Sequence, residues 1–278
     1  MAKKETALVK QETKLAEPRV EEPWEAKLRE RAKDTKAAFT AGISRVTHKG
    51  SIIKIDGKKL EANEIDVVPL GIVWVKEYYE HEYTEGSTDT PACYAFGSPD
   101  DAKEKRLTPF PQVPNKQAES CSQCQWDKFM TARKGRGKAC GDRPRMLFLL
   151  RTDLERHLNG KEVNQETLDK AIAKAPHFQI TIPSASIRNM GTFLGSLPDL
   201  TPHGDLQEAI VKIGTAPREQ GGHELTFEFL DVVPRPAMPA LMKRGDATFG
   251  LIAQPFPILA EKEEVKPVKG QGNIKKGR

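Results

Sequence analysis

The chain has 278 residues, and its 44 lysines and arginines against 39 aspartates and glutamates give a formal net charge of +5. No stretch of it approaches the roughly 18 consecutive apolar residues that a transmembrane helix needs. The N-terminus also lacks the apolar segment of a secretory signal. Membrane and secreted proteins are therefore excluded, and we expect a cytoplasmic protein that contacts no membrane.

Both ends of the chain are expected to be disordered tails. Residues 1–40 are highly charged, poor in Val, Ile and Phe, and interrupted by Pro18 and Pro23. Residues 261–278 carry six basic against three acidic residues. Segments of this composition cannot bury enough apolar surface to fold. One core domain over residues 41–260 is left between the two tails.

From Ile43 onward, apolar and polar residues alternate as in β-strands. Strands are predicted over Ile43–His48 and Ser51–Ile55, on either side of a Lys-Gly turn signal. The long β-branched and aromatic run Ile65–Tyr79 follows, and Pro69 within it marks an edge or a bulge. These three strands are predicted to form a meander.

The second half of the chain mixes strands with short helices. Strands are predicted over Met146–Arg151, Phe178–Ile182, Ala209–Thr215 and Glu224–Val233, and helices over Asn164–Ala175, with Asn164 as cap, and Ile187–Leu197, with Ser184 or Ser186 as cap. The last two strands flank a turn-rich segment and predict a hairpin. The fold class is mainly β with short helices (β or α+β), arranged as an OB-like barrel with an insertion over residues 91–145.

All four cysteines lie in this insertion, as Cys93, Cys121, Cys124 and Cys140. The Cys121-x-x-Cys124 pair places two thiolates on one tight turn, which is half of a tetrahedral zinc site. Cys140 and Cys93 complete the site if their loops fold back, and His81 is the reserve ligand for Cys93. Four protein ligands leave no position for a catalytic water, so the sequence predicts one structural Zn²⁺ that staples the insertion.

Three other interpretations of the cysteines remain open. Disulfides require an oxidising compartment, for which the sequence gives no sign. A redox-active CxxC needs a thioredoxin-like setting, which is absent from the predicted elements. Buried cysteines without a shared role are common in protein cores.

The excess positive charge is local. The segment from Lys128 to Arg145 contains seven basic residues and one acidic residue, Asp142, which gives a net charge of +6 within 18 residues. The predicted nucleic-acid contacts in this run are Arg133, Lys134, Arg136, Lys138, Arg143 and Arg145. Glycines interleaved with cations let a backbone approach phosphates closely. A solvated basic loop without a ligand is the alternative.

Aromatic residues gather near the cysteines and could stack on unpaired bases. The candidates are Trp74, Tyr78, Tyr94, Trp126 and Phe129. Strand alternation places Trp74 and Tyr78 on one face and Tyr79 and Tyr83 on the other, so these rings cannot all face one ligand. The alternative for each ring is a place in the core. No catalytic motif occurs around the six scattered histidines, so we expect no enzyme.

The cysteine and basic block resembles proteins of phages and mobile elements. Their shared pattern begins with an early β-meander, here Ile43–Ile55, and a cysteine, here Cys93. A CxxC followed by an aromatic comes next, here Cys121–Cys124 with Trp126. The pattern ends with GxGKxC and basic residues, here Gly135–Cys140 with Arg143 and Arg145. The segment Ile180–Arg188 is similar too. More broadly, the chain resembles the zinc-containing OB-fold single-stranded DNA-binding proteins of T-even-like phages. Those proteins usually end in an acidic tail that recruits partners, whereas this tail is basic.

The resemblance implies a non-catalytic single-stranded DNA-binding protein of phage replication or recombination. Its location would be the cytoplasm of a bacterial host, and its partners would be single-stranded DNA and replication or recombination proteins. A virion or assembly protein with a structural zinc is the alternative, and a nuclease or other DNA-processing enzyme is the third.

Overall fold

The computed structural model describes residues 43–81, 90–133, 136–158, 164–219 and 221–254. The predicted tails lie outside these residues, as does Lys134. The strands are β1 (Ser44–Lys49), β2 (Ile52–Ile55), β3 (Lys58–Lys59), β4 (Ile65–Tyr78), β5 (Cys93–Gly97), β6 (Cys140–Asp142), β7 (Arg145–Leu150), β8 (Phe178–Thr181), β9 (Ala209–Pro217) and β10 (His223–Val232). The α-helices are α2 (Pro99–Lys103), α3 (Arg151–Leu158), α4 (Gln165–Lys174), α5 (Ile187–Leu200), α6 (Met238–Asp246) and α7 (Thr248–Ile252).

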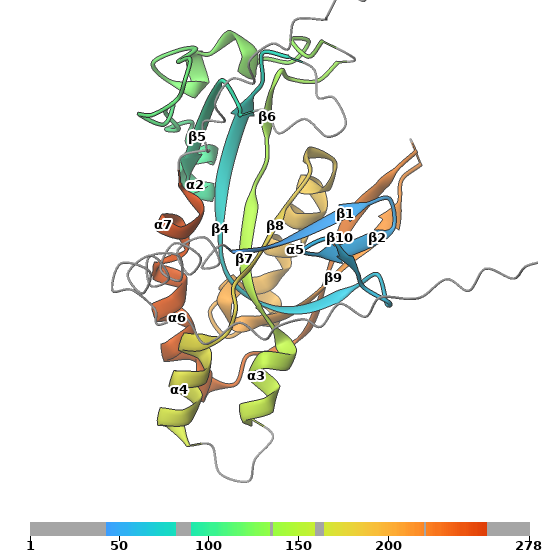
Figure 1. Cartoon of the computed structure of the whole chain (residues 1–278), viewed down its shortest axis with the longest axis vertical. Helices are drawn as coiled ribbons and strands as arrows, with labels where there is room; N and C mark the ends of the chain where they lie inside the picture. The colour runs from blue at the N-terminus through green and yellow to red at the C-terminus, as the bar shows by residue number, and fades with distance from the viewer. Residues whose placement is uncertain (1–42, 82–89, 134–135, 159–163, 220, 255–278) are drawn as a thin grey trace, which may run out of the picture. The chain divides into compact units, whose positions relative to one another are not determined.

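The described strands form one ten-stranded sheet in a mixed α/β fold. Its main path runs β10-β9-β4-β7-β8-β1-β2-β3, and β5 and β6 pair with the end of β4. The pairs are antiparallel except for β1 with β8, which is parallel. The sheet curls, so that β1 and β2 come beside β9 and β10 (Figure 1). A hydrogen bond from Thr215 Oγ1 to the carbonyl oxygen of Ser51, 3.2 Å long, joins the two sides of the curl.

The predicted meander needs a correction. Strands β1 and β2 pair as expected, but the short β3 is their third strand, and β4 lies in the middle of the sheet between β9 and β7. The reason is that β4 has buried side chains on both faces, which suits a central strand. The register of β4 against β7 shifts between Pro69 and Gly71, so the predicted bulge at Pro69 is confirmed.

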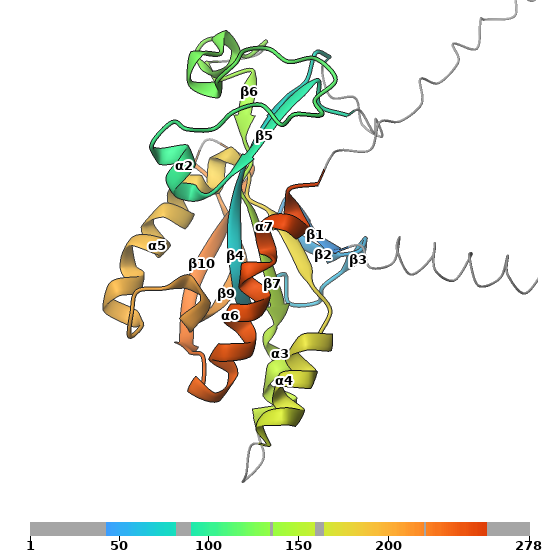
Figure 2. The same cartoon turned by 90° about the vertical axis from the view of Figure 1, so that its left-hand side faces the viewer.

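Two apolar cores cover the two faces of the sheet. Because side chains alternate along a strand, Met146 and Phe148 of β7 enter one core, whereas Leu147 and Leu149 enter the other. Helix α5 covers the first core, and α3, α4, α6 and α7 cover the second. Figure 2 shows α6 and α4 in front of the sheet and α5 at its far side.

The two predicted helices, α4 and α5, begin where the sequence predicts, whereas α2, α3, α6 and α7 were not predicted. Asn164 caps α4, since its side chain accepts a 3.0 Å hydrogen bond from the Thr167 amide. Ser186 is the cap residue of α5, but its hydroxyl instead accepts a hydrogen bond from the Leu225 amide in β10. None of the helices in the described ranges is both long and apolar enough to cross a bilayer.

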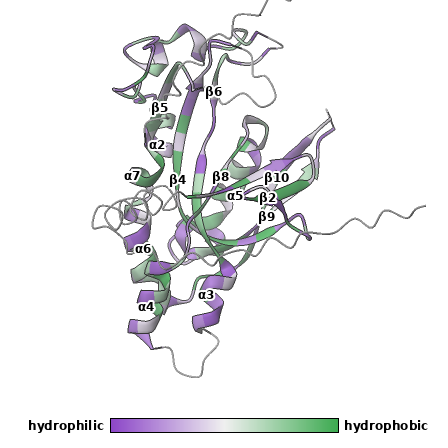
Figure 3. Ribbon diagram, viewed as in Figure 1, coloured by the Kyte–Doolittle hydropathy of each residue, from purple (hydrophilic) through white to green (hydrophobic). Residues whose placement is uncertain are grey.

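Strand β4 joins two regions of the molecule. At about 3.3 Å per residue, its 14 residues span roughly 46 Å. Its first part pairs with β9 and β7, and the remainder, Trp74–Tyr78, pairs with β5 and β6. We call the last part of β4, together with β5, α2, β6 and the described residues between them, the cysteine lobe, and the rest the sheet body. The lobe forms the upper end in Figure 1, and its loops are largely purple in Figure 3.

Candidate zinc and nucleic-acid site

The cysteine lobe brings all four cysteines around one small cavity. Cys93 and Cys140 both lie opposite Tyr78, on the strands that flank β4. Cys121 and Cys124 sit at the two ends of a 3₁₀ turn over Cys121–Gln123. All four side chains are buried and line the same cavity of about 20 Å³. The long loop after Cys93 therefore does close.

Four cysteine sulfurs are a donor set that structural zinc sites use, so the residue types around this cavity fit the predicted metal. The four cysteines form no disulfide. Burial raises the pKa of Cys121 to about 12 and also raises the pKa values of Cys93 and Cys140, so these thiols keep their protons unless a metal replaces them. As placed here, the His, Cys, Asp and Glu side chains of the described residues form no group of three or more that could hold a metal ion. His81 is exposed and lines a separate cleft.

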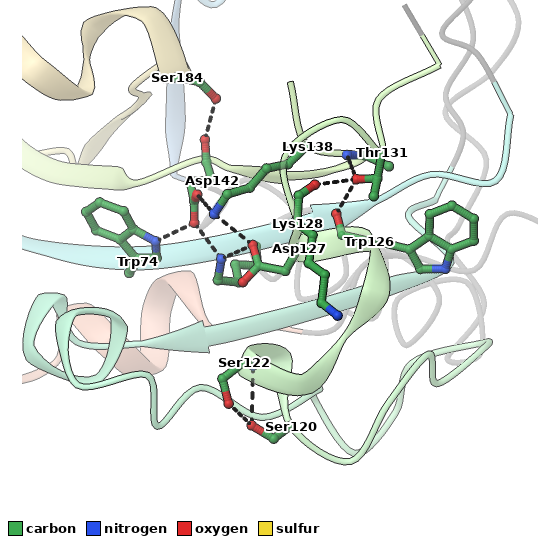
Figure 4. A network of polar contacts seen from close by, with 12 residues as sticks. Trp74, Ser120, Ser122, Trp126, Asp127, Lys128, Thr131, Lys138, Asp142 and Ser184 are labelled. Atoms are coloured by element: carbon green, nitrogen blue, oxygen red, sulfur yellow. Dashed lines mark hydrogen bonds and ion pairs between the residues drawn. The ribbon is translucent and has the colours of Figure 1, made fainter. Parts of the chain in front are cut away.

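A network of two lysines and two aspartates lies beside the cysteines (Figure 4). The buried Lys76 places its Nζ 2.7 Å from Asp127 Oδ1 and 2.8 Å from Asp142 Oδ1. Lys138 Nζ lies 3.0 Å from Asp127 Oδ1 and 3.5 Å from Asp142 Oδ2. Trp74 Nε1 donates a 2.9 Å hydrogen bond to Asp142 Oδ1. The charges balance, and Lys138 is engaged inside the lobe.

The network stabilises the charged forms of its members. Burial alone would lower the pKa of Lys76, but hydrogen bonds to Asp127 and Asp142 and the charges of both carboxylates raise it above its ordinary value. Burial alone would raise the pKa of Asp142, but its hydrogen bonds to Lys76 and Trp74 and the charge of Lys76 lower it. Lys76 and Asp142 are therefore both charged at neutral pH.

Arg145 is also paired within the protein. Its Nη2 lies 2.6 Å from Glu77 Oε1, and both side chains are largely buried. Its guanidinium carbon lies 6.0 Å from the centre of the Phe96 ring. Of the predicted phosphate contacts, Lys138 and Arg145 thus serve the lobe itself.

Three arginines of the basic run point to solvent. Arg133, Arg136 and Arg143 are exposed and have no ion pair with another described residue. The first two belong to a loop, which we call the arginine loop and which comprises the described residues 131–133 and 136–139. Thr131 closes its base, because its Oγ1 donates to the Lys128 carbonyl at 2.6 Å and accepts from the Ala139 amide at 3.0 Å. The loop thus presents cations from a fixed base.

The predicted stacking rings fall into three groups. Tyr94 is only 2% exposed and packs against Phe96 and Phe110, so it offers no open face to a base and belongs to the lobe core. Tyr78 is buried and stacks on Trp126 with ring centres 5.2 Å apart. The Trp126 ring and the Trp74 ring are partly exposed, and each donates its indole N–H to a neighbouring side chain.

Phe129 alone among the predicted stacking rings is strongly exposed, at 73%. A phenylalanine ring left in water forgoes about 1.5–3 kcal/mol of burial free energy, which makes Phe129 the best-placed ring of the set for a ligand.

Two clefts flank the arginine loop. One, of about 510 Å³, is lined by Trp126, Arg133 and Arg143 among others. The second, of about 610 Å³, has Trp74, Phe129 and five lysines in its wall. Trp126, Arg133 and Arg143 thus line one cleft, Trp74 and Phe129 line the other, and Lys138 is common to both.

The sequence prediction did not include Lys76, Asp127, Lys103 and Lys105 in the site. A signal existed for Lys76, because a Lys-Glu pair inside the apolar strand β4 requires buried partners. Asp127 gave no such signal, since it lies 51 residues from Lys76 along the chain.

In comparisons with known proteins, no family model, curated protein or solved structure matches the chain.

Proposed function

We propose that this protein binds single-stranded DNA without catalysis, through the arginine loop and the two clefts beside it. The observation that carries the proposal is the exposure of Arg133, Arg136 and Arg143, unpaired by described residues, next to Phe129 and Trp126. Positive grooves that follow phosphates, combined with rings on which bases stack, are how proteins bind single strands independently of sequence.

In this proposal the sheet body acts as an OB-like barrel, and the cysteine lobe is its zinc-stapled insertion. The curl that brings β2 beside β9 supports the first part. The shared cavity of the four cysteines supports the second, with Cys93, Cys121, Cys124 and Cys140 as ligands. When bound, the zinc supplies structural cross-linking and leaves the chemistry of the strand unchanged. The biological setting would be replication or recombination of phage or mobile-element DNA.

The nuclease alternative is less well supported by the lobe. A nuclease of the metal-dependent kind needs carboxylates that are free to hold divalent cations. The two aspartates at the floor of the larger cleft, Asp127 and Asp142, are both engaged by Lys76 and Lys138. An assembly protein with a structural zinc is the rival, but it has no need of three exposed arginines that form no ion pair with a described residue.

A titration with labelled oligo(dT) at several salt concentrations tests the proposal. Arg136→Ala should weaken binding and reduce the salt slope by about 0.7, the value for one phosphate contact on a single strand. Phe129→Ala should cost about 1–3 kcal/mol of affinity with little change in slope, because a stacking ring releases no counterions.

Trp126→Ala separates stacking from packing. A stacking role lowers affinity at constant melting temperature, whereas a packing role against Tyr78 lowers the melting temperature or zinc retention. Lys49→Ala, on β1 in the sheet body, is the control for loss of one positive charge. If Arg136→Ala changes affinity and slope no more than this control, the arginine loop is a solvated face and the proposal fails.

A further inference from the structure

The larger cleft contains more lysines than the ion pairs among the described residues of the lobe account for. Its wall contains five lysines and two aspartates. Lys76 and Lys138 are paired with the aspartates, as described above. The other three, Lys103, Lys105 and Lys128, are exposed and have no ion pair with a described residue. We call the cleft between these three lysines and Phe129 the lysine cleft.

Nearby carboxylates do not cancel this charge. Asp100, Asp101 and Glu104 lie beside the lysines in sequence, but none of them lines the cleft. Arg106 pairs with Glu104, and its Nη2 lies 2.9 Å from Asp101 Oδ1. The lysine cleft therefore keeps a net positive charge.

Two of the lysines sit at the end of a well-fixed turn. Ser98 and Asp101 form a reciprocal capping box at the start of α2. After α2, the Arg106 amide donates to the Asp101 carbonyl at 2.8 Å, and the buried Leu107 follows. A β-carbon at Gly97 would lie 2.2 Å from Leu107 Cδ2, so the chain can pack this closely only with glycine at that position. Lys103 and Lys105 are thus presented by an ordered part of the lobe.

The cleft also contains an exposed aromatic face. Phe129 lines it, and Lys138 Nζ lies 5.6 Å from the centre of its ring. Cations together with an accessible ring match a ligand that is anionic and carries flat bases, which is nucleic acid or a nucleotide. The volume of about 610 Å³ lies within the range of roughly 300–1,000 Å³ that is usual for small-ligand pockets.

We infer that the lysine cleft is a second phosphate-binding subsite, into which a single strand continues from the arginine loop. The inference rests on the proposed function and extends it to α2, which lies outside the basic run of the sequence. Lys103, Lys105 and Lys128 neutralise phosphates there, and Phe129 stacks on a base between the two subsites. In the bound state, Lys138 holds the shared wall in place through Asp127 and Asp142.

Paired variants test this inference. The double variant Lys103→Ala/Lys105→Ala is compared with Arg133→Ala/Arg136→Ala and with a control, Lys58→Ala/Lys59→Ala, which removes two adjacent exposed lysines from β3 in the sheet body. Oligo(dT) affinity is measured across a salt series for each. We expect both lobe variants to lower the salt slope by about 1.4, from two phosphates each, and the β3 control to leave it unchanged.

Each outcome has a distinct meaning. If the Lys103/Lys105 variant behaves like the β3 control while the Arg133/Arg136 variant loses slope, the inference is overturned and the proposed function stands. If the unmodified chain does not bind oligo(dT), the proposed function fails, and the inference with it.

Thymidine 5′-triphosphate, the free-nucleotide probe, is tested in parallel. If it binds as tightly as oligo(dT) and depends on the same lysines, the lysine cleft is a nucleotide pocket and not a strand subsite, which also overturns the inference. Circular dichroism melting of each variant shows that the exposed substitutions leave the fold intact.

Discussion

The sheet body and the cysteine lobe share strand β4 but are stabilised in different ways. In the described residues, the two cores of the body contain 16 and 14 buried apolar side chains. The two clusters of the lobe contain three each, and three of those six residues are cysteines. Among the described residues, two of the three buried charged side chains, Lys76 and Glu77, lie in the lobe, and the third, Glu208, lies in the body.

This difference shows how one chain can expose cations and an aromatic ring on a region with little core. Apolar burial contributes about 25 cal/mol per Å² and stabilises the body without help. The lobe has too few apolar residues for that, so its order depends on the cysteine cluster and on the ion pairs around Lys76. A region held by polar groups can expose the arginine loop and Phe129 without covering them with its own core.

The largest expected effect comes from the metal site. Structural zinc contributes apparent free energies of about 10–16 kcal/mol in small zinc-binding peptides. We therefore expect purified protein to contain one zinc per chain, and Cys124→Ser to abolish amide protection from hydrogen exchange in β5 and β6 while β7 and β9 keep theirs. Ser122→Ala, in the same turn, is the matched control. Elemental analysis that finds far less than one zinc per chain would reject the metal site.

A truncation in the core of the sheet body should destabilise the body and not the cysteine lobe. Phe148 is fully buried in β7 and stacks on Phe178 with ring centres 6.0 Å apart. Phe148→Ala should lower the free energy of unfolding by about 3–5 kcal/mol, because it leaves a cavity in the body. Chemical denaturation followed by circular dichroism measures the loss. A loss below about 1 kcal/mol would contradict the assignment of this core as the main source of stability.

The ion network should give a smaller and local effect. Asp142→Asn leaves Lys76 with Asp127 as its remaining carboxylate, and breaking a buried ion pair costs about 3–5 kcal/mol. We expect a loss near the low end, about 3 kcal/mol, seen as faster hydrogen exchange in the lobe alone. Asp199→Asn, at the exposed end of α5, controls for the charge change. Equal exchange in the two variants would show that the network does not hold the lobe.

The smallest predicted effect is a pH dependence of the body. Burial, together with the nearby charge of Arg244, lowers the pKa of His177 to about 4. An unfolded histidine titrates near 6.5, so between pH 6.5 and 4 the unfolded chain takes up a proton that the folded chain does not. The stability that comes from the neutral His177 is therefore present above pH 6.5 and is lost as the pH falls from 6.5 to 4.

His177→Gln should remove this pH dependence of the unfolding free energy, which amounts to about 1 kcal/mol after solvent screening. His157→Gln, exposed on α3, should leave it unchanged. Denaturation at pH 7 and pH 4.5 measures both variants. A pH dependence that persists in His177→Gln would assign the effect to other groups.

Much of the fold was predictable wherever the pattern was local. The continuous apolar run Met146–Leu150 located β7, and apolar–polar alternation located the β9–β10 hairpin. The capping preference of Asn164 marked the start of α4. Long-range pairing was not predictable, because the neighbours of β4 are strands that lie far away in sequence. Strands β5 and β6 were missed because they are short, with five and three residues, and β6 pairs with a part of β4 that lies more than 60 residues away in the sequence.

The site was predictable in composition more than in detail. The four cysteines lie within one 48-residue stretch of the sequence, and in the structure they line one cavity. The run of basic residues could not show that Arg145 has a partner, since Glu77 is 68 residues away from it. The partner of Lys138 four residues further on, Asp142, lies within the run itself. Nor could the run show that Lys103 and Lys105 face the same cleft as Phe129. Burial of Tyr94 also depends on packing against Phe110, which the sequence does not reveal.

The central claim is that the lobe binds single strands through unpaired cations. Its most direct test is the salt slope of oligo(dT) binding by the unmodified chain. The six cations Arg133, Arg136, Arg143, Lys103, Lys105 and Lys128 predict a slope of about −4 in log affinity against log salt, at about 0.7 per phosphate. Binding with a slope near zero, or no binding at all, would contradict the account.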